Sequence, residues 1–140
     1  MNNNQINRNW FYAFLAVAVF FLAGCDETMR VSYATAAAAR ADGAIQRGWL
    51  PQELPDSATE IAESHDLDTN TGSGSFRFEK SDADLFRAKL QPVLPAQVQL
   101  FRDPERFQRG GYTFYAVPGF VLAINWQERH AHFVLNSHNK

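Results

Sequence analysis

The sequence contains a single cysteine, Cys25, so no disulfide can form within the chain and the fold must be held by packing alone. Basic residues are also few: 13 Lys and Arg stand against 15 Asp and Glu, and they form no basic cluster. This balance argues against electrostatic binding of nucleic acid or of anionic lipid. The longest apolar run, residues 10–23, is shorter than the roughly 20 residues that a membrane-spanning helix needs.

The N-terminal segment has the organisation of a signal peptide. Residues 1–9 are polar, with Arg8 as the one basic side chain, and the apolar run of residues 10–23 ends at small residues, as a cleavage site does. The run leads into the motif Leu22-Ala23-Gly24-Cys25. This motif resembles the lipobox of bacterial lipoproteins, in which a peptidase cuts before the cysteine. The resemblance implies that residues 1–24 are a signal peptide and that cleavage falls between the last two residues of the motif.

The same resemblance implies a lipid anchor. Cys25 would carry diacylglycerol on its thiol and a further acyl chain, such as palmitate, on its new α-amine. Each buried CH₂ contributes about 0.8 kcal/mol, so two or three chains hold a protein in a bilayer. We therefore expect the protein at the periplasmic side of the cell membrane. Asp26 resembles the second residue of lipoproteins kept at the inner membrane, with the outer membrane as the alternative. An uncleaved signal anchor and an ordinary cleaved signal peptide are the other interpretations.

The remainder of the chain has the length of one domain. Removal of residues 1–24 leaves 140 − 24 = 116 residues, which suits a single hydrophobic core. We predict that residues 25–32 form the lipidated cysteine and a short tether, and that residues 33–140 form a single α+β domain. Its expected architecture is an antiparallel sheet of four or five strands with one or two helices packed on one face.

Hydrophobic periodicity and turn residues predict the individual elements. Helices are expected over residues 33–47, over residues 81–90 and, for one turn, after Asp103. Strands are expected over residues 58–67, 75–79, 96–101, 112–117, 120–126 and 131–135. The last two strands predict a hairpin, because one register places every large apolar residue on one face. That register sets Trp126 opposite Ala131, Ile124 opposite Phe133 and Leu122 opposite Leu135.

Two histidines on the last strand are the strongest candidates for metal ligands. His130 and His132 are two residues apart, so both imidazoles project from one face. They could hold a divalent metal if His65, Asp66 or Asp68 supplied a third ligand. Two ligands alone are a weak signal, and the alternative interpretation is a pair of histidines on the solvated face of the sheet. No metal and no cofactor is therefore predicted.

Residues 66–72 have part of the spacing of a calcium-binding loop. Asp66, Asp68 and Asn70 match the first three ligand positions of an EF-hand. Thr71 stands where that loop needs glycine, and Arg77 stands where it needs glutamate. The EF-hand interpretation therefore fails, and the segment is interpreted as a turn in which Asp and Asn side chains bind nearby backbone N–H groups.

The sequence carries no complete catalytic motif. His65 with Glu63 and Asp66 offers acid–base chemistry, but the nucleophile motif Gly-x-Ser-x-Gly is missing. Residues 44–51 and 65–70 resemble small bacterial lipoproteins without assigned activity. The first hypothesis is therefore a non-enzymatic binding or accessory module that contacts an envelope protein. The alternatives are a metal-binding lipoprotein and a small hydrolase that uses His65.

Overall fold

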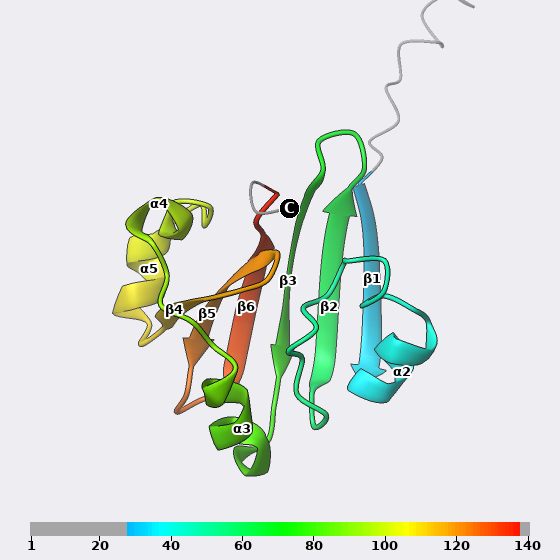
Figure 1. Cartoon of the computed structure of the whole chain (residues 1–140), viewed down its shortest axis with the longest axis horizontal. Helices are drawn as coiled ribbons and strands as arrows, with labels where there is room; N and C mark the ends of the chain where they lie inside the picture. Colours follow the sequence, from blue (N-terminus) through cyan, green and yellow to red (C-terminus); the bar gives the residue numbers. More distant parts are fainter. Residues whose placement is uncertain (1–27, 138–140) are drawn as a thin grey trace, which may run out of the picture.

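A six-stranded antiparallel sheet forms the centre of the protein, and the computed structural model describes it within residues 28–137 (Figure 1). The strands lie in the order β1-β2-β3-β6-β5-β4. Two three-stranded meanders, β1-β2-β3 and β4-β5-β6, therefore meet where β3 pairs with β6. The strands are β1 (Thr28–Thr35), β2 (Thr59–Asp66), β3 (Thr71–Arg77), β4 (Thr113–Val117), β5 (Phe120–Asn125) and β6 (His130–Leu135). The α+β class is as predicted, and the sheet has six strands rather than four or five.

All helices that the structure describes are short. They are α2 (Ala36–Ala41), the 3₁₀ helix η1 (Lys80–Asp82), α3 (Ala83–Ala88), α4 (Pro95–Val98) and α5 (Pro104–Arg109). Within residues 28–137, no helix has the length and apolar character needed to cross a bilayer. The motif that ends at Cys25, with its predicted cleavage and lipidation, lies outside the described residues.

The first strand corrects the prediction of a tether followed by a long helix. β1 begins at Thr28 and pairs with β2 along its length, with Tyr33 opposite Ile61. The helix begins only after Thr35, whose side chain accepts a hydrogen bond from the Ala38 N–H at 3.2 Å. Strand pairing and the burial of Tyr33 thus outweigh the helix propensity of the alanine-rich sequence.

The predicted strand over residues 96–101 is also wrong. α4 occupies the first half of this segment, because Pro95 is favoured at the start of a helix and lacks the N–H that a strand needs. Leu94 donates its backbone N–H to the Gln97 side chain at 2.8 Å, which fixes the helix start. Leu100, within the segment that was predicted as a strand, is 38% exposed.

The hydrophobic core has a part on each face of the sheet. The larger part contains Phe76, Leu122 and Phe133 and is covered by α2, by residues 43–58 and by α3. The smaller part contains Phe114 and Val121 and is covered by residues from α4 and α5. The prediction that helices pack on one face is therefore wrong for the β4-β5-β6 half, where both faces are covered. The sheet has the predicted solvent-exposed face only on β1, β2 and β3.

The C-terminal hairpin has the predicted inward face in a different register. Leu122 lies opposite Phe133 and Ile124 lies opposite Ala131, a shift of two residues from the prediction. A shift of two leaves every side chain on its predicted face, because the side-chain period of a strand is two. The shift arises at the turn, where the Asn125 side chain accepts the Glu128 N–H at 3.0 Å and closes a four-residue loop.

Candidate functional site

One face of the β1-β2-β3 meander carries only small or polar side chains. We call this surface the open face, and it consists of Arg30, Ser32, Ala34, Ala62, Ser64, Ser73, Ser75 and Arg77. The register places these residues on one side, since Ser32, Ala62 and Ser75 pair across the three strands. All of them are exposed or half-buried. The opposite side of the same strands holds Tyr33, Ile61 and Phe76, which are buried.

A groove lies at the end of the open face where β1 begins. Its floor carries the side chains of Ser64, Thr71 and Ser73, and its wall includes Phe101 and Arg102. The Asp66 carboxylate stands at the same end, and its Oδ1 accepts the N–H groups of Asp68 and Thr69 at 2.9 and 3.1 Å. These bonds match the predicted turn, in which the Asp66 side chain accepts hydrogen bonds from nearby backbone N–H groups.

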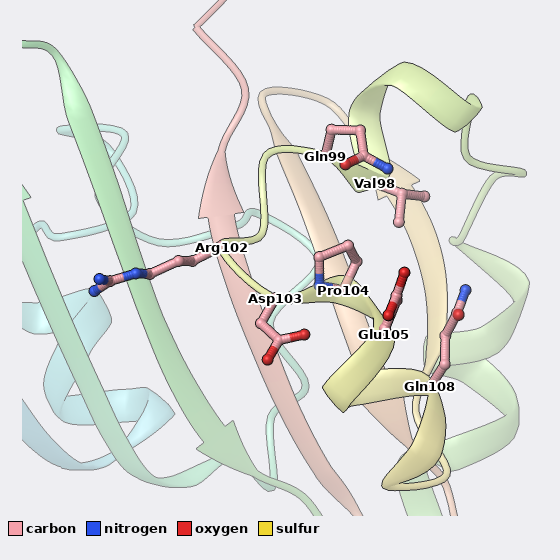
Figure 2. Close-up of a pocket in the computed structure, with 7 residues that line it drawn as sticks. All are labelled: Val98, Gln99, Arg102, Asp103, Pro104, Glu105 and Gln108. Carbon is pink, nitrogen blue, oxygen red and sulfur yellow. The ribbon is translucent and has the colours of Figure 1, made fainter.

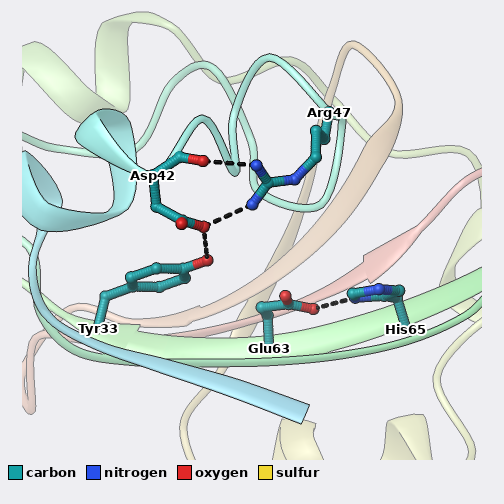
Figure 3. A network of polar contacts seen from close by, with 5 residues as sticks. All are labelled: Tyr33, Asp42, Arg47, Glu63 and His65. Atoms are coloured by element: carbon teal, nitrogen blue, oxygen red, sulfur yellow. Dashed lines mark hydrogen bonds and ion pairs between the residues drawn. The ribbon is translucent and has the colours of Figure 1, made fainter. Parts of the chain in front are cut away.

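His65 lies on the side of the sheet opposite to the open face. Its Nδ1 is 2.8 Å from Oε2 of Glu63, and both residues are buried, with 6% and 4% of their surface exposed (Figure 3). The indole of Trp49 stacks on the imidazole with ring centroids 3.8 Å apart and planes 7° apart. Among the described residues, no hydroxyl group hydrogen-bonds to His65. This arrangement pairs the imidazole with Glu63 and covers one of its faces with Trp49.

A second polar network ties α2 to the sheet. The Tyr33 hydroxyl donates to Oδ2 of Asp42 at 2.7 Å, and the Arg47 guanidinium binds both the carboxylate and the carbonyl of Asp42 (Figure 3). The hydrogen bonds from Tyr33 and Arg47 lower the pKa of the Asp42 carboxyl. Burial, followed by the bond to Asp42, raises the pKa of the Tyr33 phenol. The network holds the turn after α2 against β1 and is structural.

The two strand histidines form a cluster on the same side of the sheet as the open face. The rings of His130 and His132 have centroids 4.5 Å apart, and Nδ1 of His130 is 2.9 Å from the Tyr112 hydroxyl. Burial and the neighbouring His130 lower the pKa of His132 to about 4. Burial and the positive charge of Arg77 lower the pKa of His130. Both imidazoles are therefore uncharged at neutral pH.

The register separates the residues of the hypothetical metal site. His132 pairs with Ser75, whereas His65 pairs with Gly72, three positions away along β3 and therefore on the other face. Within residues 28–137, no group of three His, Cys, Asp or Glu side chains is placed to hold a metal ion. The sequence correctly predicted that His130 and His132 share a face. Of the third ligands that it considered, His65 lies on the opposite face. Asp66 lies on the same face but pairs with Thr71, four positions along β3 from Ser75, and Asp68 lies beyond the end of β2.

Two participants in these sites were not identified from the sequence. Trp49 lies in the connection between α2 and β2, and it covers His65. Arg102 follows a segment that was interpreted as a strand, so its place beside the groove could not be anticipated. Aromatic side chains next to proline-rich connections were the only available signal for Trp49.

A protein-family model matches the part of the chain that carries the open face. Residues 27–77 match the family model of the YbbD head domain. The match spans β1, α2, β2 and β3 and covers about a third of the chain. The similarity to the YbbD head domain thus includes the open face, Glu63 and His65, and excludes the two strand histidines. No curated protein and no solved structure has significant similarity to the chain.

Proposed function

We propose that this protein is a lipid-anchored, non-enzymatic binding module of the bacterial envelope, and that it contacts an envelope protein through the open face. The observation that carries the proposal is the asymmetry of the β1-β2-β3 meander. One side is buried under α2 and residues 43–58, and the other side stays bare. The similarity of residues 27–77 to the YbbD head domain favours a bacterial envelope protein and falls on the same meander.

The shape of the open face favours a protein as the occupant. Neighbouring strands lie about 4.8 Å apart, so three strands with small side chains make a flat surface. Small molecules are bound in concave pockets, whereas a flat surface fits another protein surface. Alanine and serine at the centre of the face, such as Ala62 and Ser75, let a partner approach the backbone closely.

The proposed anchor is tested by comparing the full chain with its Cys25→Ala variant in a bacterial host. Wild type should incorporate labelled palmitate and fractionate with membranes. The variant should lose the label and leave the acylated membrane fraction. Equal palmitate labelling of the two proteins would contradict lipidation at Cys25.

The proposed contact is tested by cross-linking from membranes with an open-face variant. Ala62→Arg places a long charged side chain in the centre of the face and should abolish a specific cross-linked partner. Ala88→Arg makes the same change at an exposed alanine of α3 and should leave the partner in place. Capture that is equal in the two variants, or equal to that of an untagged control, would rule out the open face as the binding surface.

A further inference from the structure

A cleft opens between α5 and the sheet, on the same side as the open face. Its walls are formed by Arg102, Asp103, Arg106, Phe107, Tyr112 and His132. The cleft measures about 790 Å³. That size lies within the roughly 300–1,000 Å³ of sites that bind small organic molecules and is larger than a bare inorganic ion needs.

The cleft has an excess of positive charge. Arg102 and Arg106 are exposed, and neither guanidinium forms a hydrogen bond or an ion pair within the part of the chain that the structure describes. Asp103 is the one carboxylate in the walls, and its Oδ1 accepts the Arg106 backbone N–H at 3.0 Å. Figure 2 shows the Arg102 side chain pointing away from Pro104 and toward the sheet.

The opposite wall is aromatic and uncharged. His132 packs edge to face against Phe107 and Tyr112, with ring centroids 5.1 and 5.6 Å apart. The Tyr112 hydroxyl is occupied by His130. Within residues 28–137, neither nitrogen of His132 has a hydrogen-bond partner, and neither is sealed from solvent. His132 therefore offers a free ring nitrogen to a molecule in the cleft.

We propose that this cleft binds a small organic anion, whose carboxylate or phosphate is held by Arg102 and Arg106 and whose body packs on Phe107 and Tyr112. Guanidinium groups present paired N–H donors that match the oxygens of both anions. The free nitrogen of His132 adds a hydrogen bond next to the aromatic rings. The cleft lies outside residues 27–77, so this proposal stands independently of the contact through the open face.

The test is an NMR titration of the full chain in detergent micelles with ¹³C-labelled histidine. Glucuronate supplies a carboxylate on a ring, glucose supplies the ring without the charge, and inorganic phosphate supplies the charge without the ring. Each probe is titrated to about 20 mM, since a fragment-sized ligand is expected to bind with a Kd of about 1 mM. His65, which lies on the opposite side of the sheet, is the internal reference.

Glucuronate should shift the His132 resonance saturably and leave His65 unchanged, glucose should have no effect, and phosphate should compete more weakly. Arg102→Gln and Arg106→Gln should each weaken glucuronate binding about tenfold or more, as expected for the loss of a charged hydrogen bond. Arg109→Gln is the matched control, because Arg109 is exposed on α5 and pairs with Glu105 outside the cleft.

Three results would overturn the proposal. If neither anion shifts the His132 resonance saturably, the cleft is not an anion-binding site. If glucose shifts it as much as glucuronate does, the charge of the ligand plays no part in binding. If phosphate binds as tightly as glucuronate, the organic part of the ligand contributes nothing to binding. The substituted arginines are exposed, and an unchanged circular dichroism spectrum confirms that each variant is folded.

Discussion

The ring of Phe133 lies against the backbone of Gly74, its direct partner across the junction of β3 and β6. A methyl group on Gly74 would lie 2.3 Å from Cζ of Phe133 and 2.2 Å from the carbonyl oxygen of Ala62. The two meanders of the sheet meet at this junction, and the missing side chain leaves the space that Phe133 fills. Glycine at this position is thus required by packing.

We expect Gly74→Ala to destabilise the protein by about 1–3 kcal/mol or more, because Phe133 or the backbone must move to accept the methyl group. Gly72→Ala is the control on the same strand, since its nearest neighbour would be Cβ of Leu135 at 3.6 Å. That change should stay within about 0.5 kcal/mol of wild type. Urea unfolding of both variants decides, and equal stability of the two would contradict the close packing at Gly74.

Trp126 should contribute strongly to stability although it lies in the turn after β5. Its ring packs edge to face on Phe78 and Tyr115, and the Arg87 guanidinium lies 4.3 Å from its ring centroid. We expect Trp126→Ala to cost about 3 kcal/mol, at the low end of the range for buried tryptophan because the side chain is half-buried.

Tyr115→Phe tests the polar part of the same contact. It removes only the hydroxyl that accepts the Trp126 indole N–H at 3.1 Å, so it should cost about 1 kcal/mol. Thermal or chemical unfolding measures both values. A loss below about 1 kcal/mol for Trp126→Ala would show that this aromatic cluster is not part of the core.

The Glu63–His65 pair should show strong coupling. His65→Phe preserves a ring for Trp49 to stack on but leaves the buried Glu63 side chain without its hydrogen-bond partner, which should cost about 1–3 kcal/mol. The double variant Glu63→Leu/His65→Phe removes both polar groups and should be more stable than His65→Phe alone. A double-mutant cycle by urea unfolding measures the coupling, and additive effects would contradict the buried pair.

Stability should fall as the pH is lowered from about 7 toward 4. The pKa of His132 is lowered from 6.5 to about 4 in the folded protein, so between these values the unfolded chain takes up a proton that the folded chain does not. The contribution of the uncharged His132 to the free energy of unfolding is fully present above pH 6.5 and is lost as the pH falls to about 4. His130 acts in the same direction.

The variant His132→Gln isolates this effect. Its free energy of unfolding should decline less between pH 7 and pH 5 than that of wild type, because glutamine does not titrate. Urea unfolding at several pH values gives both slopes. A steeper slope for the variant would show that His132 gains a proton on folding, opposite to the effect of its burial.

The sequence predicted the parts of the fold that have strong periodicity. β5 and β6 alternate cleanly, so their inward face was correct even though the register differed by two residues. The register depends on the bond between Asn125 and the Glu128 N–H, which periodicity does not report. Residues 36–41 are alanine-rich and helical as expected, whereas β1 was missed because its strand character comes from pairing with β2.

The candidate sites were less predictable, because they depend on which strands become neighbours. Spacing alone placed His130 and His132 on one face, but only the pairing of β3 with β6 shows that His65 lies on the other. The pair of Glu63 and His65 follows from strand alternation and was within reach of the sequence. The cleft was not within reach of the sequence, since Arg106 is brought near His132 by α5 and Arg102 by the connection before that helix.

If Cys25 carries acyl chains as proposed, the early start of β1 limits how far the domain can stand from a membrane. Two residues, Asp26 and Glu27, separate Cys25 from Thr28, and the three residue steps from Cys25 to Thr28 span at most about 11 Å in a fully extended chain. With acyl chains on Cys25, the first strand would therefore begin among or directly above the lipid headgroups. Thr28 borders the groove at the end of the open face, so that end would point toward the bilayer. A domain anchored in this way could not reach across the periplasm, and its partner would have to come to the same membrane surface.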